Sequence, residues 1–182
     1  MNIRDASNAD IPAIRELVFG VLKSYGLKPD PTTTDRDLDD IERSYFHGGG
    51  RFSVLEDEGR IIGSYGLWRI DDHECELRKM YLSAGHRGKG LGRLLLEHAL
   101  RSAEQLGFWA VCLETASILK EARALYVKYG FMPYHPAHLS ARCDQAYRKD
   151  LRRPNQALLP TPMSVTDRAG ARSAPATGAA DL

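Results

Sequence analysis

The chain has few cysteines, no metal-binding motif and no disulfide pattern. Its three cysteines, Cys75, Cys112 and Cys143, lie far apart and belong to no Cys-x-x-Cys pair or Cys/His cluster. This spacing indicates neither a disulfide framework nor a zinc site, so we expect buried free thiols in a reducing compartment. None of the histidines forms a His-x-x-x-His or Glu-x-x-His pair, and we expect no metal.

The sequence also lacks long apolar runs and an excess of charge of either sign. No stretch approaches the roughly 20 apolar residues that span a membrane, and Met1–Asp5 lacks the apolar core of a signal peptide. The formal net charge of +1 creates no strong field toward nucleic acid or an anionic membrane. We therefore expect a cytoplasmic protein that binds neither nucleic acid nor membranes.

Composition divides the chain near residue 151. Up to that point, apolar segments with a regular period alternate with turn signals, which is typical of a globular domain. Residues 152–182 are rich in Pro, Ala, Thr and Gly and contain no aromatic residue. Such a segment buries too little apolar surface to offset its ordering entropy. We expect a folded domain over residues 1–151 and a disordered tail over residues 152–182, with partner binding as the alternative role of the tail.

Apolar periodicity predicts a mixed α/β domain. Helical spacing covers residues 11–25, 35–46, 90–106 and 119–129. Runs typical of strands cover residues 51–56, 60–70, 75–82, 109–114, 131–134 and 142–151, with an extra strand at residues 2–5. This order describes a mixed sheet with helices on its faces.

A glycine-dense turn joins an expected strand to an expected helix. Its sequence is Arg87-Gly88-Lys89-Gly90-Leu91-Gly92. Glycines let a ligand approach the backbone closely, and a helix start directs unpaired N–H groups and partial positive charge outward. With Arg87 and Lys89 beside it, the turn suits a phosphate or pyrophosphate. The alternative is a plain connection with solvated basic residues, and the spacing is that of neither a P-loop nor a dinucleotide fingerprint.

This turn resembles the Arg/Gln-x-x-Gly-x-Gly/Ala signature of the GNAT acetyltransferases, which binds the pyrophosphate of acetyl-CoA. Farther along, Leu113-Glu114-Thr115 and then Ala124-Leu125-Tyr126-x-x-Tyr-Gly-Phe131 are similar to the family's second motif. The resemblance covers about residues 3–150. It implies the GNAT fold, in which a mixed, mostly antiparallel sheet of about six or seven strands is flanked by about four helices. It also implies an acetyl-CoA-dependent N-acetyltransferase.

The resemblance assigns the cofactor contacts to a strand end and to the glycine turn. These residues are Met80, Tyr81, Leu82, Arg87, Gly88, Lys89, Gly90, Leu91 and Gly92. In the family the strand that holds Met80 splays from the next strand, here residues 109–114, and the cofactor occupies the gap. A backbone N–H near Met80 is the expected donor to the oxyanion.

The resemblance further implies direct attack of an amine on the thioester, which needs a base and an acid. Glu76 matches a position from which some members supply a glutamate base, directly or through water. An ion pair with Arg78 or Lys79 is the alternative. Tyr126 matches the tyrosine whose hydroxyl meets the CoA sulfur, and a phenol is a suitable proton donor to a thiolate. Packing on a helix face is its alternative role.

The acceptor amine is less well defined. The resemblance points to a bacterial subgroup that acetylates small amines or amino acids, so we expect a small-molecule primary amine. A protein N-terminus or lysine, and a non-catalytic acyl-CoA sensor, are the alternatives. Arg78 and Arg142 are candidates to grip a substrate carboxylate, and Glu114 either faces the acceptor or pairs with a lysine such as Lys120. Family members are often dimers, so a homodimer is a further expectation.

Four aspartates gather at the start of the second expected helix: Asp35, Asp37, Asp39 and Asp40. A solvated helix start stabilised by the helix dipole is the simpler interpretation. Recruitment of a cationic acceptor is the alternative.

Overall fold

The computed structural model describes residues 1–151. The tail expected over residues 152–182 lies outside the described residues. None of the described helices combines the length and the apolar character that a membrane crossing requires. Cys75, Cys112 and Cys143 are free thiols, the first two buried and the third half-buried.

A seven-stranded sheet forms the centre of the described domain, with the strand order β1-β2-β3-β4-β5-β7-β6. Its strands are β1 (Asn2–Asp5), β2 (Arg51–Asp57), β3 (Arg60–Arg69), β4 (Glu74–Leu82), β5 (Ala110–Thr115), β6 (Met132–Pro133) and β7 (Gln145–Asp150). Only the β4–β5 pair is parallel, and the other neighbouring pairs are antiparallel. The mixed, mostly antiparallel sheet expected from the sequence is confirmed.

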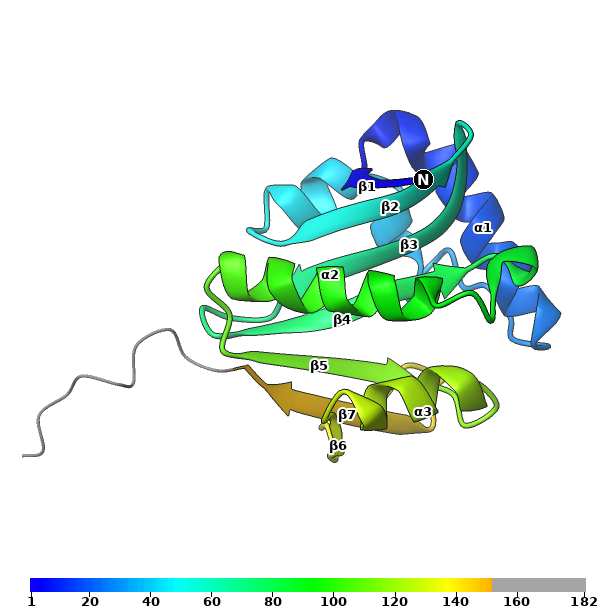
Figure 1. Cartoon of the computed structure of the whole chain (residues 1–182). Coiled ribbons are helices and arrows are strands. Elements are labelled where there is room, and N and C mark those ends of the chain that lie inside the picture. The colour runs from blue at the N-terminus through cyan, green and yellow to red at the C-terminus, as the bar shows by residue number, and fades with distance from the viewer. Residues whose placement is uncertain (152–182) are drawn as a thin grey trace, which may run out of the picture. The chain divides into compact units, whose positions relative to one another are not determined.

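The helices lie on both faces of this sheet. They are α1 (Ile11–Ser24), α2 (Leu91–Gln105) and α3 (Lys120–Lys128), together with 3-10 turns η1 (Asn8–Asp10), η2 (Arg36–Leu38) and η4 (Ala84–His86) and the π-helical turn η3 (Glu42–Phe46). Figure 1 shows α2 and α3 across one face of the sheet and α1 across the other. The helices and the sheet therefore bury two apolar layers, one on each face.

The two core layers follow from the spacing of apolar residues in the helices and strands. Helix α1 buries Ile14, Val18 and Leu22, which recur at helical spacing, against Phe52 and Val54 of β2. On the opposite face, α2 buries Leu95, Leu96 and Ala99 together with Tyr65 and Leu67 of β3. Alternate residues of a strand face opposite sides of a sheet, so β2 and β3 contribute to both layers.

The second helix expected at residues 35–46 is present only as the short turns η2 and η3. Asp35 and Asp37 both contact Lys79. Residues two apart point to different sides of an α-helix, so a regular helix cannot direct both carboxylates to one ammonium. The tertiary contact therefore overrides the helical periodicity in this segment.

The sheet opens between β4 and β5. These strands pair only at Glu74↔Ala110, Cys75↔Val111 and Glu76↔Cys112, although β4 continues to Leu82 and β5 to Thr115. Beyond this point β4 stays paired with β3, and β5 stays paired with β7. The ends of β4 and β5 consequently border an opening in the sheet, as the sequence resemblance implies.

Gly66 of β3 provides a test of this packing. A Cβ atom at Gly66 would lie 2.5 Å from Cε1 of Tyr45, so we predict that Gly66→Ala lowers the free energy of unfolding by about 1–3 kcal/mol through overpacking. Gly20 in α1 has open space around it, and Gly20→Ala should raise stability by roughly 0.5–1 kcal/mol. Urea denaturation measures both effects. An unchanged midpoint for Gly66→Ala would contradict the contact between β3 and Tyr45.

Candidate active site

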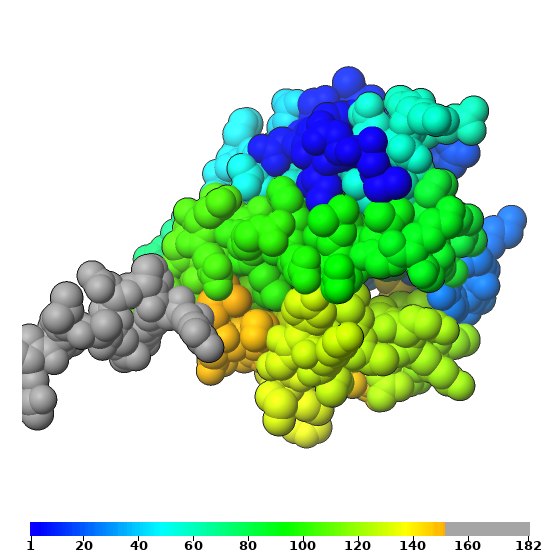
Figure 2. Space-filling model, in the orientation of Figure 1, coloured from blue at the N-terminus to red at the C-terminus, as the bar shows by residue number. Residues whose placement is uncertain are grey.

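A cavity of about 390 Å³ lies where β4 and β5 part. Its walls come from the end of α1, from β4, from the glycine turn, from the end of β5 and from α3. In Figure 2 a crevice separates the green surface of α2 from the yellow-green surface of α3. A second hollow of about 420 Å³ lies at the end of α1, and none of the predicted site residues lines it. The first cavity is therefore the candidate site.

Six of the nine predicted cofactor residues line this cavity: Met80, Tyr81, Leu82, Arg87, Gly88 and Gly92. The other three have different surroundings. Lys89 is exposed, Gly90 is the N-cap of α2, and the side chain of Leu91 packs in the core. At positions 90 and 91, only the backbone is available to a ligand at the helix start.

The glycine turn has the backbone conformation that its residues permit. Gly88 and Gly90 have φ values of +75° and +79°, in the left-handed region. A Cβ atom at either position would meet no atom within 4 Å. The left-handed backbone conformation, and not a lack of space for a side chain, therefore explains why glycine occupies both positions. The turn leads directly into α2, whose first N–H groups have no partner within the helix.

Arg87 is held at the cavity wall by three contacts. Its Nε donates to the Leu82 carbonyl oxygen at 3.2 Å, and its Nη1 donates to the Tyr25 hydroxyl at 3.0 Å. The guanidinium carbon also lies 5.0 Å from the centroid of the Tyr25 ring, within cation–π range. The contribution of Tyr25 was not expected from the sequence, because α1 and the turn are far apart in the chain.

Glu76 is both paired and exposed to the cavity. Arg78 Nε donates to Glu76 Oε2 at 2.7 Å, so one of the two expected ion pairs is present. The same carboxylate lines the cavity. Burial raises the pKa of the Glu76 carboxyl above its ordinary value, and Arg78 offsets only part of that effect. Glu76 therefore forms the expected ion pair with Arg78 and also lines the cavity.

Tyr126 lines the same cavity from α3. Its hydroxyl donates to the Met80 sulfur at 3.9 Å, and its ring centroid lies 5.7 Å from that of Phe131. Burial raises the pKa of the phenol well above its ordinary value. The residue thus packs in the core while its hydroxyl faces β4.

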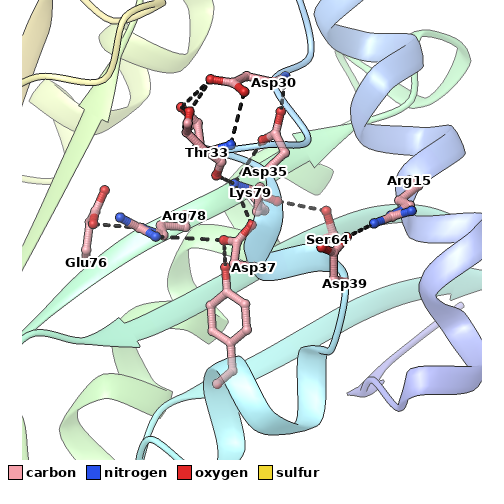
Figure 3. A network of polar contacts seen from close by, with 12 residues as sticks. Arg15, Asp30, Thr33, Asp35, Asp37, Asp39, Ser64, Glu76, Arg78 and Lys79 are labelled. Atoms are coloured by element: carbon pink, nitrogen blue, oxygen red, sulfur yellow. Dashed lines mark hydrogen bonds and ion pairs between the residues drawn. The ribbon is translucent and has the colours of Figure 1, made fainter.

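Asp35 and Asp37 are buried, and the expectation that they form a solvated helix start is wrong. Lys79 Nζ lies 3.1 Å from Asp35 Oδ1 and 3.1 Å from Asp37 Oδ1. It also donates to the carbonyl oxygen of Thr34 at 2.8 Å. The Tyr45 hydroxyl donates to Asp37 Oδ2 at 2.5 Å. Figure 3 shows Lys79 reaching from β4 toward both aspartates.

Lys79 also occupies a β-bulge. Ser64 pairs with Tyr81, and Gly66 pairs with Arg78, so Lys79 and Met80 together oppose one residue of β3. The φ value of Lys79 is +52°, which is uncommon for a residue with a side chain. Ser64 Oγ donates to the Lys79 carbonyl oxygen at 2.8 Å. The bulge changes the direction of the β4 backbone immediately before Met80.

The residues proposed to contact the substrate, Arg78, Arg142 and Glu114, all line the cavity. Arg142 donates from Nη1 and Nη2 to the carboxylate of Asp35 at 2.7 and 2.6 Å. Arg78 is bonded to Glu76 and lies 4.9 Å from the centroid of the Trp68 ring. Both guanidinium groups therefore already have a carboxylate partner from the chain itself.

Glu114 has a different partner from the one expected. Its Oε2 accepts hydrogen bonds from the backbone N–H of Ser140 at 2.9 Å and from the Ser140 hydroxyl at 2.6 Å. The suggested pairing with Lys120 is wrong, since that lysine is exposed and forms no ion pair with Glu114 among the described residues. Within residues 1–151, no group of three or more His, Cys, Asp or Glu side chains is placed to hold a metal ion.

Comparison with known proteins matches this chain to N-acetyltransferases. A family model described as the acetyltransferase (GNAT) family matches residues 16–131. The uncharacterised N-acetyltransferase YjgM of Escherichia coli is 39% identical over 127 residues, which are 67% of this chain and 76% of that protein. Human N-acetyltransferase 8B is 35% identical over 101 residues, which are 52% of this chain and 44% of that protein. The chain thus matches less than half the length of this human relative.

Solved structures share the fold. A GNAT-family acetyltransferase from Staphylococcus aureus superposes with a TM-score of 0.77 at 23% identity, covering 83% of this chain and 99% of that one. The acetyltransferase yncA of Salmonella typhimurium, solved with acetyl-CoA, superposes with a TM-score of 0.66 at 23% identity, covering 83% of this chain and 94% of that one.

The buried pairing of Lys79 leads to a stability prediction. Lys79→Met leaves Asp35 and Asp37 without this ammonium, and we expect it to lower the free energy of unfolding by about 3–5 kcal/mol. Arg148→Met is the control, because it removes solvent-accessible ion pairs with Glu74 and Asp150 and should cost at most about 1 kcal/mol. Urea denaturation of both variants is the measurement. Equal losses would show that Lys79 contributes no more than a surface pair.

Proposed function

The chain belongs to the GNAT acetyltransferase family, and as an acyltransferase of that family we propose that it transfers the acetyl group of acetyl-CoA directly to a primary amine of a small molecule. The observation that carries this proposal is the shared cavity of Glu76, Tyr126 and the glycine turn. These come from β4, from the turn that follows it and from the distant helix α3, and they supply a base, an anion site and an acid. We assign this activity to residues 1–151 and expect it in the cytoplasm.

The open end of β4 supports the proposed position of acetyl-CoA. After Glu76, β4 is paired with β3 on one side only, so alternate backbone N–H and C=O groups face the cavity and can bond the amide groups of the pantetheine arm. The glycine turn and the start of α2 would bind the pyrophosphate. Arg87, which forms no ion pair within residues 1–151, would add a full positive charge.

The proposed reaction needs three proton transfers: one from the acceptor ammonium before the attack, a second from the same nitrogen to water after the attack, and one to the departing sulfur. Glu76 accepts a proton from the acceptor ammonium, directly or through water, and its raised pKa brings it closer to the working pH. The amine nitrogen then attacks the thioester carbonyl carbon, and a backbone N–H at the bulge near Met80 stabilises the oxyanion. As the carbon–sulfur bond breaks, Tyr126 donates to the departing sulfur. Its raised pKa keeps the hydroxyl protonated until charge develops there.

The size of the cavity favours a small acceptor. About 390 Å³ must accommodate both the reacting end of the cofactor and the acceptor, which is at the lower end of typical ligand sites. A protein N-terminus or lysine is the alternative acceptor. Amino acids are the acceptors suggested by the sequence resemblance, but the two arginines proposed to hold their carboxylate are both paired with acidic residues.

A thiol-release assay tests the proposed function. Purified protein is mixed with acetyl-CoA and a panel of amino acids, polyamines, aminoglycosides and short peptides. We expect release of CoA with at least one class of small amine. Release only with peptides would favour the protein acceptor, and no release with any acceptor would contradict the proposal.

Tyr126→Phe tests the proposed acid. Removing the hydroxyl should lower kcat by roughly ten- to a thousand-fold, within the range for lost acid catalysis, while acetyl-CoA binding is preserved. Tyr129→Phe is the control, since the Tyr129 hydroxyl bonds Glu97 on α2. Steady-state kinetics and calorimetry provide the two measurements. An unchanged kcat for Tyr126→Phe would remove Tyr126 from the mechanism.

Glu76→Gln tests the base through the pH dependence of kcat/KM. A base must be ionised, so activity should fall as the pH drops through the raised pKa of Glu76. The acid limb should therefore lie above the value of roughly 4.3 for an unperturbed glutamate. Glu76→Gln should remove this limb and lower kcat about 10²- to 10⁴-fold. Glu74→Gln, on the same strand, should retain the limb. A limb that persists in Glu76→Gln would assign it to another group.

A further inference from the structure

The basic residues at the acceptor end of the cavity are neutralised by the chain itself. Arg142 is bonded to Asp35 through both terminal nitrogens, and Lys79 lies between Asp35 and Asp37. Arg78 is bonded to Glu76. Three cations thus face three carboxylates, and a substrate carboxylate would find no net positive charge there. It would also have to displace a partner from a partly buried pair, which is costly.

Glu114 is a charged residue at this end of the cavity that no described residue of opposite charge neutralises. It lines the cavity, and its hydrogen-bond donors, the N–H and hydroxyl of Ser140, are neutral. No cation of residues 1–151 lies within ion-pair distance of its carboxylate. Glu121 also borders the cavity without an ion pair, but it is exposed on the first turn of α3, where water and the helix dipole stabilise its charge.

Glu114 is directed to the same side of the sheet as Glu76. Glu76 pairs with Cys112 in the parallel register of β4 and β5, so the two residues share one face of the sheet. Glu114 follows Cys112 by two residues, and residues two apart on a strand point to the same face. The two carboxylates therefore flank the opening at which the strands part. Arg87, at the other end of the cavity, is a cation without a carboxylate partner among the described residues. The cavity consequently has an uncompensated positive charge at the turn and an uncompensated negative charge at Glu114.

We propose that Glu114 selects the acceptor by binding a second positive charge on it, so that the substrate class is a small diamine or polyamine without a carboxylate. This proposal rests on the acetyltransferase function proposed above. One amine of the acceptor reacts at Glu76, and another ammonium pairs with the carboxylate that Ser140 holds in place. A charge-assisted contact of this kind is favourable because Glu114 has no competing cation. An amino acid of equal length is disfavoured by its carboxylate.

Matched acceptors test the charge preference. Cadaverine and lysine differ by one carboxylate, as do putrescine and ornithine, and n-pentylamine lacks the second charge of cadaverine. We expect kcat/KM for cadaverine to exceed that for lysine by about a hundred-fold and that for n-pentylamine by about ten-fold, since a tenfold change corresponds to one ordinary charge-assisted contact. Equal or better use of lysine or n-pentylamine would overturn the proposal, as would turnover confined to acceptors outside this class.

Glu114 variants test the residue. Glu114→Gln keeps an amide oxygen for Ser140, so it should raise KM for cadaverine about ten-fold, with little change in kcat or in the use of n-pentylamine. Glu114→Asp should restore part of the affinity, and Glu104→Gln on the exposed face of α2 is the charge-matched control. Unchanged KM in a folded Glu114→Gln variant that still binds acetyl-CoA would overturn the role of Glu114. No CoA release from wild-type protein with any amine would instead overturn the underlying function.

Discussion

The arrangement of the site depends on one buried cation. Lys79 extends from the bulge of β4 into the segment between α1 and β2, where Asp35 and Asp37 neutralise it. A buried ammonium is tolerated only with such partners, and the partners are equally costly without the ammonium. The pairing therefore fixes the position of a segment that has little regular structure of its own. Asp35 also forms an ion pair with Arg142. This second pair holds the loop before β7 at the cavity.

The bulge and the parting of the strands make the sheet available to a ligand. An uninterrupted β4–β5 pair would use the backbone groups after Glu76 in the ladder, whereas here only three residue pairs join these strands. Tyr126 closes the opening from α3, and the start of α2 borders it with the glycine turn. Burial around the opening raises the pKa values of both Glu76 and Tyr126. In the proposed mechanism, the burial that raises these two pKa values also strengthens the interactions of Glu76 and Tyr126 with developing charge.

The features that the sequence predicted well depend on local pattern. Strand alternation, helical spacing and the glycine turn identified the sheet, α2 and α3, and the family resemblance selected Glu76 and Tyr126, which both line the cavity. The features that it missed depend on contacts between distant residues. Asp35 and Arg142 are 107 positions apart, and the pattern of alternating aspartates at 35–40 is locally indistinguishable from a solvated helix start. The left-handed conformation of Lys79 is also invisible locally, because the residue type gives no sign of it.

In the proposed function, the opening between β4 and β5 binds acetyl-CoA through the glycine turn. Calorimetric titration of acetyl-CoA into the wild-type protein and into a folded Gly90→Glu variant tests it most directly. We expect micromolar binding to the wild type and its loss in the variant, where a carboxylate would meet the pyrophosphate at the start of α2. Absence of binding to the wild type, or equal binding to both proteins, would contradict it.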